Sequence, residues 1–215
     1  MPPALTIPLF PLNTVLFPGA TIPLQIFESR YLAMIRDCLS ADSKFGVVLI
    51  KEGSEVGIPA TPHSVGTIAN IISAQKITGN RMLISVKGER RFKIRKILRN
   101  RPYISAEIDI ESATKKEVIT QKEIERFYAS TTRHINLVLN KKEEWIKAPR
   151  FPSSPKMLSY FIAQTLSIDL FERQRLLSEP SYLQQLEICK EHIDRETDEI
   201  IEKISLDLVK AFRHH

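Results

Sequence analysis

The spacing of apolar residues changes near residue 113 of this 215-residue chain, and this change constrains the fold more than any other feature. Before it, apolar and polar residues alternate in short runs such as 22–27 and 103–110, which is the period of a half-buried strand. After it, apolar residues recur three and four positions apart, the period of an amphipathic helix. We therefore expect an α+β chain with a β subdomain over residues 1–113 and a helical subdomain over residues 114–215.

The first part contains short β-rich runs that are separated by proline, glycine and polar turns. Proline cannot donate a ladder hydrogen bond, so Pro8, Pro11 and Pro23 predict strands at sheet edges, at strand starts or at bulges. Strands are expected over residues 7–9, 15–17, 22–27, 45–50, 67–77, 82–87, 91–98 and 103–110. A short helix that begins at Ser29 precedes the fourth of these, and Gly88 is expected to interrupt the sheet. So many short strands without helical crossovers predict a closed or nearly closed antiparallel barrel.

The second part predicts an α-helical bundle that ends in a long helix. Residues 119–139 carry acids early and bases later, which suits the helix dipole. The last helix is expected from Tyr182 to near Phe212, roughly 45 Å at the helical rise, so its outer turns either complete the bundle or pair with another protein. Three pairs of residues have the spacing of helix starts: Ser154 with Pro155, Asp169 with Glu172, and Ser181 with Gln184.

The sequence lacks the patterns that carry catalysis or bind cofactors and metals. It has only seven glycines, and neither a G-x-x-x-x-G-K-[ST] loop nor a G-x-G-x-x-G motif, which cradle nucleotide phosphates. Its five histidines and two cysteines form no three- or four-ligand zinc pattern. No activated serine or cysteine is recognisable. We therefore expect a protein that is not an enzyme, with no cofactor and no metal.

The two cysteines and the N-terminus indicate where the chain functions. Cys38 and Cys189 lie too far apart in sequence to suggest a disulfide framework, and Cys38 is expected to be a buried, inert thiol. No apolar run approaches the roughly 18 residues that cross a bilayer, and the first basic residue is Arg30, too late for a secretory signal. We expect a cytoplasmic protein without a membrane segment.

The positive charge of the chain, formally +6, is concentrated between Lys76 and Arg101, where ten basic residues accompany one acid. If residues 91–98 form a strand with Phe92 inward, then Arg91, Lys93 and Arg95 face solvent together. Such a row is a candidate surface for an anionic partner such as RNA. The favoured interpretation is a solvated face that discourages edge-to-edge pairing, because Phe92 points inward and the aromatic residues that stack on bases are missing.

Two further groups near the N-terminus have a structural and a functional interpretation. Phe10, Phe17 and Phe27 are candidates to line a binding groove, but core positions are the favoured interpretation for all three. Glu28 and Arg30 beside a tyrosine resemble an acid–base cluster, but a structural ion pair is the simpler interpretation.

Several segments together resemble a known family. They are IPLFPL at 7–12, LFPG at 16–19, PL at 23–24, IFESRY at 26–31, GTIA at 66–69, GERRFKI at 88–94, PYISA at 102–106, IA at 162–163 and QRLL at 174–177. In order and spacing they resemble the N-terminal, substrate-binding domain of Lon protease over residues 7–205. The resemblance implies a PUA-like β-barrel joined to an α-helical bundle. It also implies a stand-alone member of the family, because the ATPase and Ser-Lys peptidase modules have no room in this chain.

The resemblance leads to two functional hypotheses. The first is a non-catalytic module that binds unfolded or tagged protein segments, or another protein through the C-terminal helix, as an adaptor in protein quality control. The alternative is an RNA-binding PUA-like module that uses the basic strand face. Homology to peptidase family S16 does not imply peptidase activity here.

Overall fold

The computed structural model describes residues 5–54, 60–111, 117–141 and 151–213. Contacts between residues divide the chain into two compact units. Unit 1 comprises Met1–Lys115 and Ile168–Ser178, and unit 2 comprises Lys116–Ser167 and Glu179–His215. Within the described ranges, no helix combines the length and the apolar character that a bilayer crossing requires.

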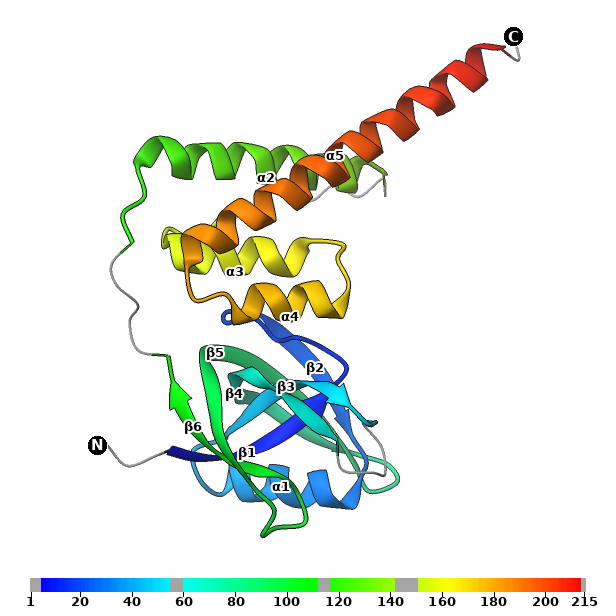
Figure 1. The fold of residues 1–215 in the computed structure, drawn as a ribbon. Helices are drawn as coiled ribbons and strands as arrows, with labels where there is room; N and C mark the ends of the chain where they lie inside the picture. The colour runs from blue at the N-terminus through cyan, green and yellow to red at the C-terminus, as the bar shows by residue number, and fades with distance from the viewer. Residues whose placement is uncertain (1–4, 55–59, 112–116, 142–150, 214–215) are drawn as a thin grey trace. The chain divides into compact units, whose positions relative to one another are not determined.

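Unit 1 is a barrel in which one long strand closes the sheet (Figure 1). Its strands follow the order β2-β5-β4-β3-β1-β6, and β5 pairs with β6 as well, so the sheet closes on itself. The first half of β5 pairs with β2 and its second half pairs with β6. The strands are β1 (Leu5–Leu12), β2 (Thr21–Ile26), β3 (Lys44–Glu52), β4 (Thr61–Ile77), β5 (Arg81–Leu98) and β6 (Ser105–Ile110).

The predicted α+β class, with strands first and helices after them, is confirmed. One pairing differs from the antiparallel expectation, because β1 and β3 run parallel. A parallel pair needs a long connection, and here β2 and helix α1 (Ser29–Leu39) return the chain to the end at which β1 began. The narrower assignment to PUA-like barrels stays a prediction.

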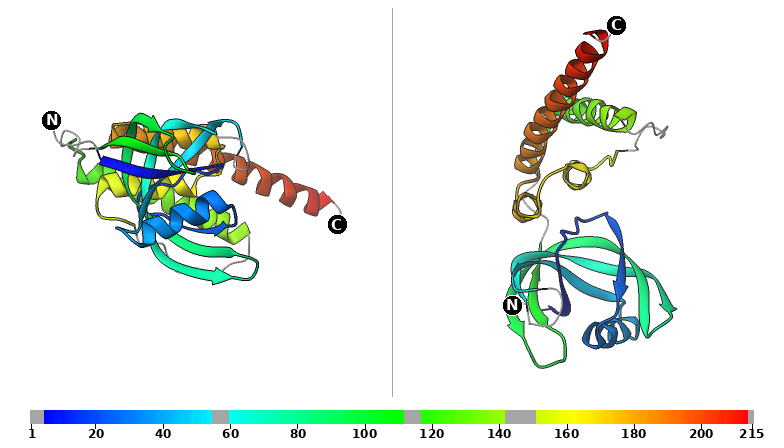
Figure 2. Two further views of the ribbon diagram at one scale, coloured as in Figure 1. Left: turned by 90° about the horizontal axis from the view of Figure 1, so that it is seen from below. Right: turned by 90° about the vertical axis from the view of Figure 1, so that its right-hand side faces the viewer.

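Helices α1 and α4 (Leu170–Ser178) lie against opposite sides of the barrel (Figures 1 and 2). Helix α1 inserts Leu32, Met34 and Ile35 into a large apolar cluster of the barrel, where all three are fully buried. Burying each such side chain contributes about 1.5–3 kcal/mol. The side of α1 that faces solvent is therefore held on a rigid support.

Helix α4 is grouped differently by sequence and by structure. Residues 168–178 lie within the predicted helical subdomain 114–215, yet their contacts place them in unit 1. The Gln174 amide donates to the Val65 carbonyl at 3.1 Å, and the Arg91 guanidinium donates to the Leu177 carbonyl at 2.6 Å. The buried face of this helix thus completes the barrel.

Two predicted details of the strands are wrong, and one contact explains both. Residues 15–17 form no strand, and β5 runs through Gly88 without ending. The loop before β2 docks on this glycine: Gly19 donates to its carbonyl at 2.8 Å, and its amide donates to Ala20 at 2.9 Å. A Cβ atom on Gly88 would lie 2.4 Å from the Phe17 carbonyl oxygen. Position 88 therefore needs a glycine, because the backbone of the loop before β2 packs directly against it.

Unit 2 consists of α2 (Gln121–Lys141), α3 (Pro155–Thr165) and α5 (Tyr182–Arg213). Helix α5 packs on both of the others and extends beyond them (Figure 1). Buried polar groups tie the helices together, since His134 on α2 contacts the Thr197 hydroxyl at 3.2 Å and the Ser159 hydroxyl donates to Gln185 at 2.7 Å. The predicted long last helix is confirmed.

Candidate functional site

The basic residues of β5 do not form the single solvent-facing row that the sequence predicts. Arg91 is only 6% exposed, and its guanidinium forms a bidentate ion pair with Glu111. Phe92, its neighbour, fills the barrel interior. Both faces of β5 are buried at this point because α4 covers the outer face of the barrel. Arg91 is therefore inaccessible to an anionic partner.

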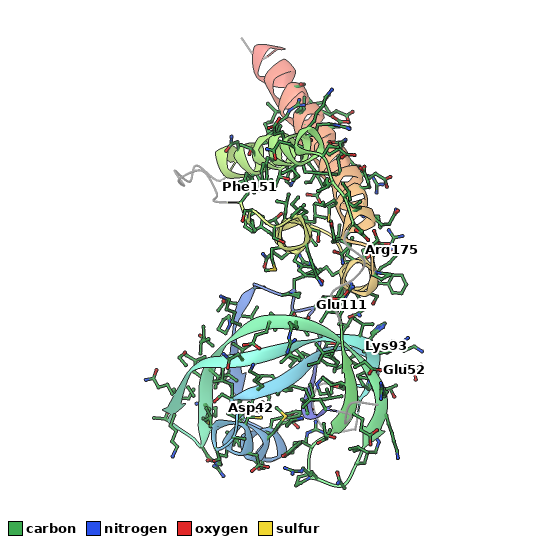
Figure 3. The ribbon with its side chains drawn as sticks, turned by 90° about the vertical axis from the view of Figure 1, so that its left-hand side faces the viewer. Asp42, Glu52, Lys93, Glu111, Phe151 and Arg175 are labelled. Atoms are coloured by element: carbon green, nitrogen blue, oxygen red, sulfur yellow. The ribbon has the colours of Figure 1, made fainter. Side chains whose placement is uncertain are left out.

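Lys93 and Arg95 are exposed, as predicted, but acids accompany them. Arg95 is paired with Asp109 at 2.5 Å, and this ion pair raises the pKa of the arginine. Asp109 is also the cross-strand partner of Lys93 in the register of β5 and β6 (Figure 3 labels Lys93). The local charge is thus largely neutralised, and the RNA-binding alternative is not favoured.

A different surface of unit 1 has the form of a binding site. Three hollows lie next to one another beside α1, and neighbouring hollows share lining residues. We call the three together the α1 surface, and the individual hollows the apolar, arginine and acidic hollows. Tyr31 lines both the apolar and the arginine hollow, and Arg101 and Tyr103 line both the arginine and the acidic hollow.

The apolar hollow lies where β2 leads into α1. It has a volume of about 60 Å³ and is lined by Phe10, Leu12, Phe27 and Tyr31 among others. Phe10 and Tyr31 are buried with ring centroids 4.3 Å apart, whereas Phe27 is 55% exposed. A large aromatic side chain held at the rim of an apolar hollow is typical of a site that contacts apolar side chains of a partner.

The arginine hollow has a volume of about 210 Å³. Arg30, Arg99 and Arg101 line it together with the apolar surface of Pro102 and Ile104. It lies between the first turn of α1 and the connection from β5 to β6, which are far apart in sequence. Three arginines around one hollow create a positive potential there.

The acidic hollow also measures about 210 Å³ and is lined by Asp37, Asp42 (labelled in Figure 3) and Lys44 among others. A hydrogen-bonded network separates it from the arginine hollow. The Tyr103 hydroxyl donates to Asp37 at 2.6 Å, and Arg101 donates to the same hydroxyl at 2.7 Å. Burial, followed by the bond to Asp37, raises the pKa of Tyr103, so the phenol stays protonated at neutral pH.

The aromatic and charged candidates near the N-terminus separate into core and surface. Phe10 and Phe17 are buried, which matches the core interpretation, while Phe27 is the exposed member. Glu28 and Arg30 form the predicted ion pair at 3.0 Å. Sequence patterns did not predict the arginine hollow, because closure of the barrel brings Arg30 and Arg101 together. Basic residues in two distant segments were a signal too weak to place it.

The described residues contain no group that suggests catalysis. They include no cluster of three or more histidine, cysteine or acidic side chains that could hold a metal ion. Both cysteines are free and buried, and burial raises the pKa of each thiol to about 12. Cys38 is therefore the inert thiol that the sequence predicts. The α1 surface offers charge, hydrogen bonds and apolar contact, which serve binding.

Comparison with known proteins associates the chain with one family of domains. Residues 6–195 match the model of the ATP-dependent protease La (LON) substrate-binding domain, and the match includes neither a protease nor an ATPase domain. The Lon protease of Anaeromyxobacter dehalogenans is 25% identical over 204 residues, which cover 89% of this chain and 23% of that protease. The Lon protease of Parabacteroides distasonis is 32% identical over 122 residues, which cover 56% of this chain and 15% of that protease. The chain thus spans about a quarter or less of these relatives.

Solved structures match over nearly their whole length. The Lon N-terminal domain protein from Xanthomonas campestris superimposes with a TM-score of 0.66 at 27% identity, covering 85% of this chain and 95% of that one. The N-terminal domain of a Mycobacterium avium complex Lon protease superimposes with a TM-score of 0.64 at 17% identity. The superposition covers 88% of this chain and 98% of that one, and it shows a shared fold. Barrel and helices are therefore both part of the common architecture.

Proposed function

The chain belongs to the family of Lon substrate-binding domains, and from this premise we propose that it binds extended polypeptide segments of other proteins without catalysing a reaction on them. The observation that carries the proposal is the α1 surface, in which an apolar hollow adjoins two polar ones through shared residues. An unfolded segment presents apolar and charged side chains in close succession, and this surface has a complementary hollow for each kind.

The rigidity of the support favours binding at this place. Residues at the base of the apolar hollow, such as Phe10 and Tyr31, belong to the main apolar cluster of the barrel. A preformed hollow loses little conformational entropy when it accepts a segment, so more of the contact energy appears as affinity. The exposed Phe27 is the side chain that we expect to contribute most.

We also propose a setting for this binding: an adaptor in protein quality control that holds segments for a separate protease in the cytoplasm. The two free cysteines are consistent with a reducing compartment. The outer part of α5, where Ile204 and Leu206 are exposed, is the proposed contact for a partner protein.

Titration of the chain with a fluorescently labelled, reduced and carboxymethylated protein, which cannot fold, tests the proposed function. We expect saturable binding that Phe27→Ser weakens about tenfold, because the substitution removes an aromatic contact worth more than about 1 kcal/mol. The fold should be unaffected, since Phe27 is more than half exposed.

Phe171→Ser on α4 is the matched control, because it removes an equally apolar side chain that is 69% exposed. The control variant should bind like the unmodified chain. Absence of saturable binding to any unfolded chain would contradict the proposed function, and weakening by Phe171→Ser alone would move the site away from the α1 surface.

A further inference from the structure

The charges around the arginine hollow do not balance. Arg30 is paired with Glu28 at 3.0 Å, and Arg101 with Asp37 at 3.2 Å. Arg99, which is exposed, forms no ion pair with any residue that the structure describes. Among the described residues, Arg99 is thus the arginine of the hollow whose charge no carboxylate compensates.

Two of the three guanidinium groups, those of Arg30 and Arg101, are held in place by more than their ion pairs. The guanidinium of Arg30 lies over the ring of Tyr31, 4.6 Å from its centroid. That of Arg101 lies over the ring of Tyr103 at 5.7 Å and donates to the Tyr103 hydroxyl at 2.7 Å. Stacked, hydrogen-bonded arginines lose little rotamer freedom on binding an anion, and their planar N–H groups match a carboxylate.

The position of the arginine hollow indicates which group of the ligand lies next to the anion. Tyr31 forms part of the wall of both the arginine hollow and the apolar hollow, in which Phe27 is exposed. A ligand that places an anionic group against Arg99 therefore has an apolar hollow next to it. Adjacent side chains of one extended segment fit this arrangement.

We propose that the arginine hollow binds a carboxylate of the polypeptide segment, next to an apolar side chain that occupies the apolar hollow. This proposal rests on the proposed function and names the chemistry that the site selects. The carboxylate comes from an acidic side chain or from the C-terminus of the segment. One uncompensated positive charge matches a monoanion, whereas a phosphate dianion would leave the site negatively charged.

Fluorescence anisotropy with short labelled peptides tests the proposal on the full chain. One peptide contains a Phe-Asp pair within an otherwise uncharged, amidated sequence, and a second replaces the aspartate with asparagine. A third ends at the phenylalanine and keeps its C-terminal carboxylate free. We expect the carboxylate peptides to bind about tenfold more tightly than the neutral one, and the comparison of the first with the third identifies the source of the carboxylate.

Arg99→Gln should abolish this preference, because it removes the positive charge of the hollow that no described carboxylate compensates. Arg81→Gln, which removes an exposed arginine at the turn between β4 and β5, is the matched control and should keep the preference. An equal loss of the carboxylate preference in Arg99→Gln and Arg81→Gln would show unspecific electrostatic attraction and overturn the proposal.

The remaining outcomes separate this proposal from the proposed function. Equal binding of acidic and neutral peptides, still weakened by Phe27→Ser, would overturn the carboxylate preference and leave polypeptide binding intact. Tighter binding of a phosphoserine peptide than of the aspartate peptide would contradict the single-charge argument. Absence of binding by every peptide and every unfolded chain would overturn both.

Discussion

Single arginines in this chain have different roles according to their burial. Arg91 is buried under α4, and its charge is compensated by Glu111 and by the Leu177 carbonyl. Arg95, two residues further on the same strand, forms an exposed ion pair with Asp109. A buried ion that loses its partner keeps the cost of desolvation, whereas an exposed one is solvated by water. Arg91 therefore serves the fold.

Replacing each of these two arginines by methionine separates a buried ion pair from an exposed one. Arg91→Met removes the guanidinium that pairs with Glu111 at a mostly buried position, so we expect the free energy of unfolding to fall by about 3 kcal/mol or more. Urea denaturation followed by circular dichroism measures this change. Arg95→Met is the control, and its unfolding midpoint should stay within error of the unmodified chain.

The double variant Arg91→Met with Glu111→Leu refines this comparison. Removing both charges should restore part of the lost stability, because the Glu111 carboxylate then no longer stays mostly buried without the Arg91 guanidinium. A loss equal to the sum of the two single changes would contradict a buried pair. So would an Arg91→Met variant that is as stable as Arg95→Met.

At the scale of elements, the loop that precedes β2 is held by the middle of β5. Gly88 exchanges two backbone hydrogen bonds with Gly19 and Ala20, and its missing side chain gives room to the Phe17 carbonyl. Leu16 and Phe17 are buried although they belong to no strand. This loop delivers β2 to the edge of the barrel, and β2 leads directly into Phe27 and α1.

A methyl group at position 88 tests that contact. In Gly88→Ala the added carbon would lie 2.4 Å from a backbone oxygen, so the loop or β5 must shift. We expect a loss of about 1–3 kcal/mol in stability by chemical denaturation, as for other overpacked sites. Ser73→Ala, at an exposed position of β4, should change stability by less than about 0.5 kcal/mol. Unchanged stability in Gly88→Ala would contradict the close approach.

Much of the fold was predictable because local rules decide it. Alternation of apolar residues indicated the strands, and the caps that begin with Asp169 and Ser181 placed two helices correctly: the amides of Glu172 and Gln184 donate to them at 2.8 and 3.0 Å. The errors at residues 15–17 and Gly88 arose from packing between distant segments, which local patterns do not contain. Residues can be buried without being in a strand.

The candidate site was less predictable for the same reason. A charge count along β5 indicated Arg91, Lys93 and Arg95, yet the cover of α4 and the acids of β6 determine what these side chains do. The arginine hollow joins residues of α1 to residues that follow β5, and only barrel closure brings them together. Its recognition needs the three-dimensional structure.

At the scale of the whole molecule, the barrel is a support that keeps the α1 surface in a fixed form. The family match extends over residues 6–195 and so includes both units, while the α1 surface lies within unit 1 alone. Binding by this protein is therefore expected to protect one restricted set of backbone amides and to leave the others unchanged.

Hydrogen–deuterium exchange of the full chain, with and without a saturating unfolded protein, measures this most directly. Bound polypeptide should slow amide exchange in residues 25–31 and 99–104, the two segments that contribute most of the lining of the apolar and arginine hollows. Exchange in α4 and at the turn between β4 and β5 should stay unchanged. Protection confined to those other segments, or no protection at saturation, would contradict binding at the α1 surface.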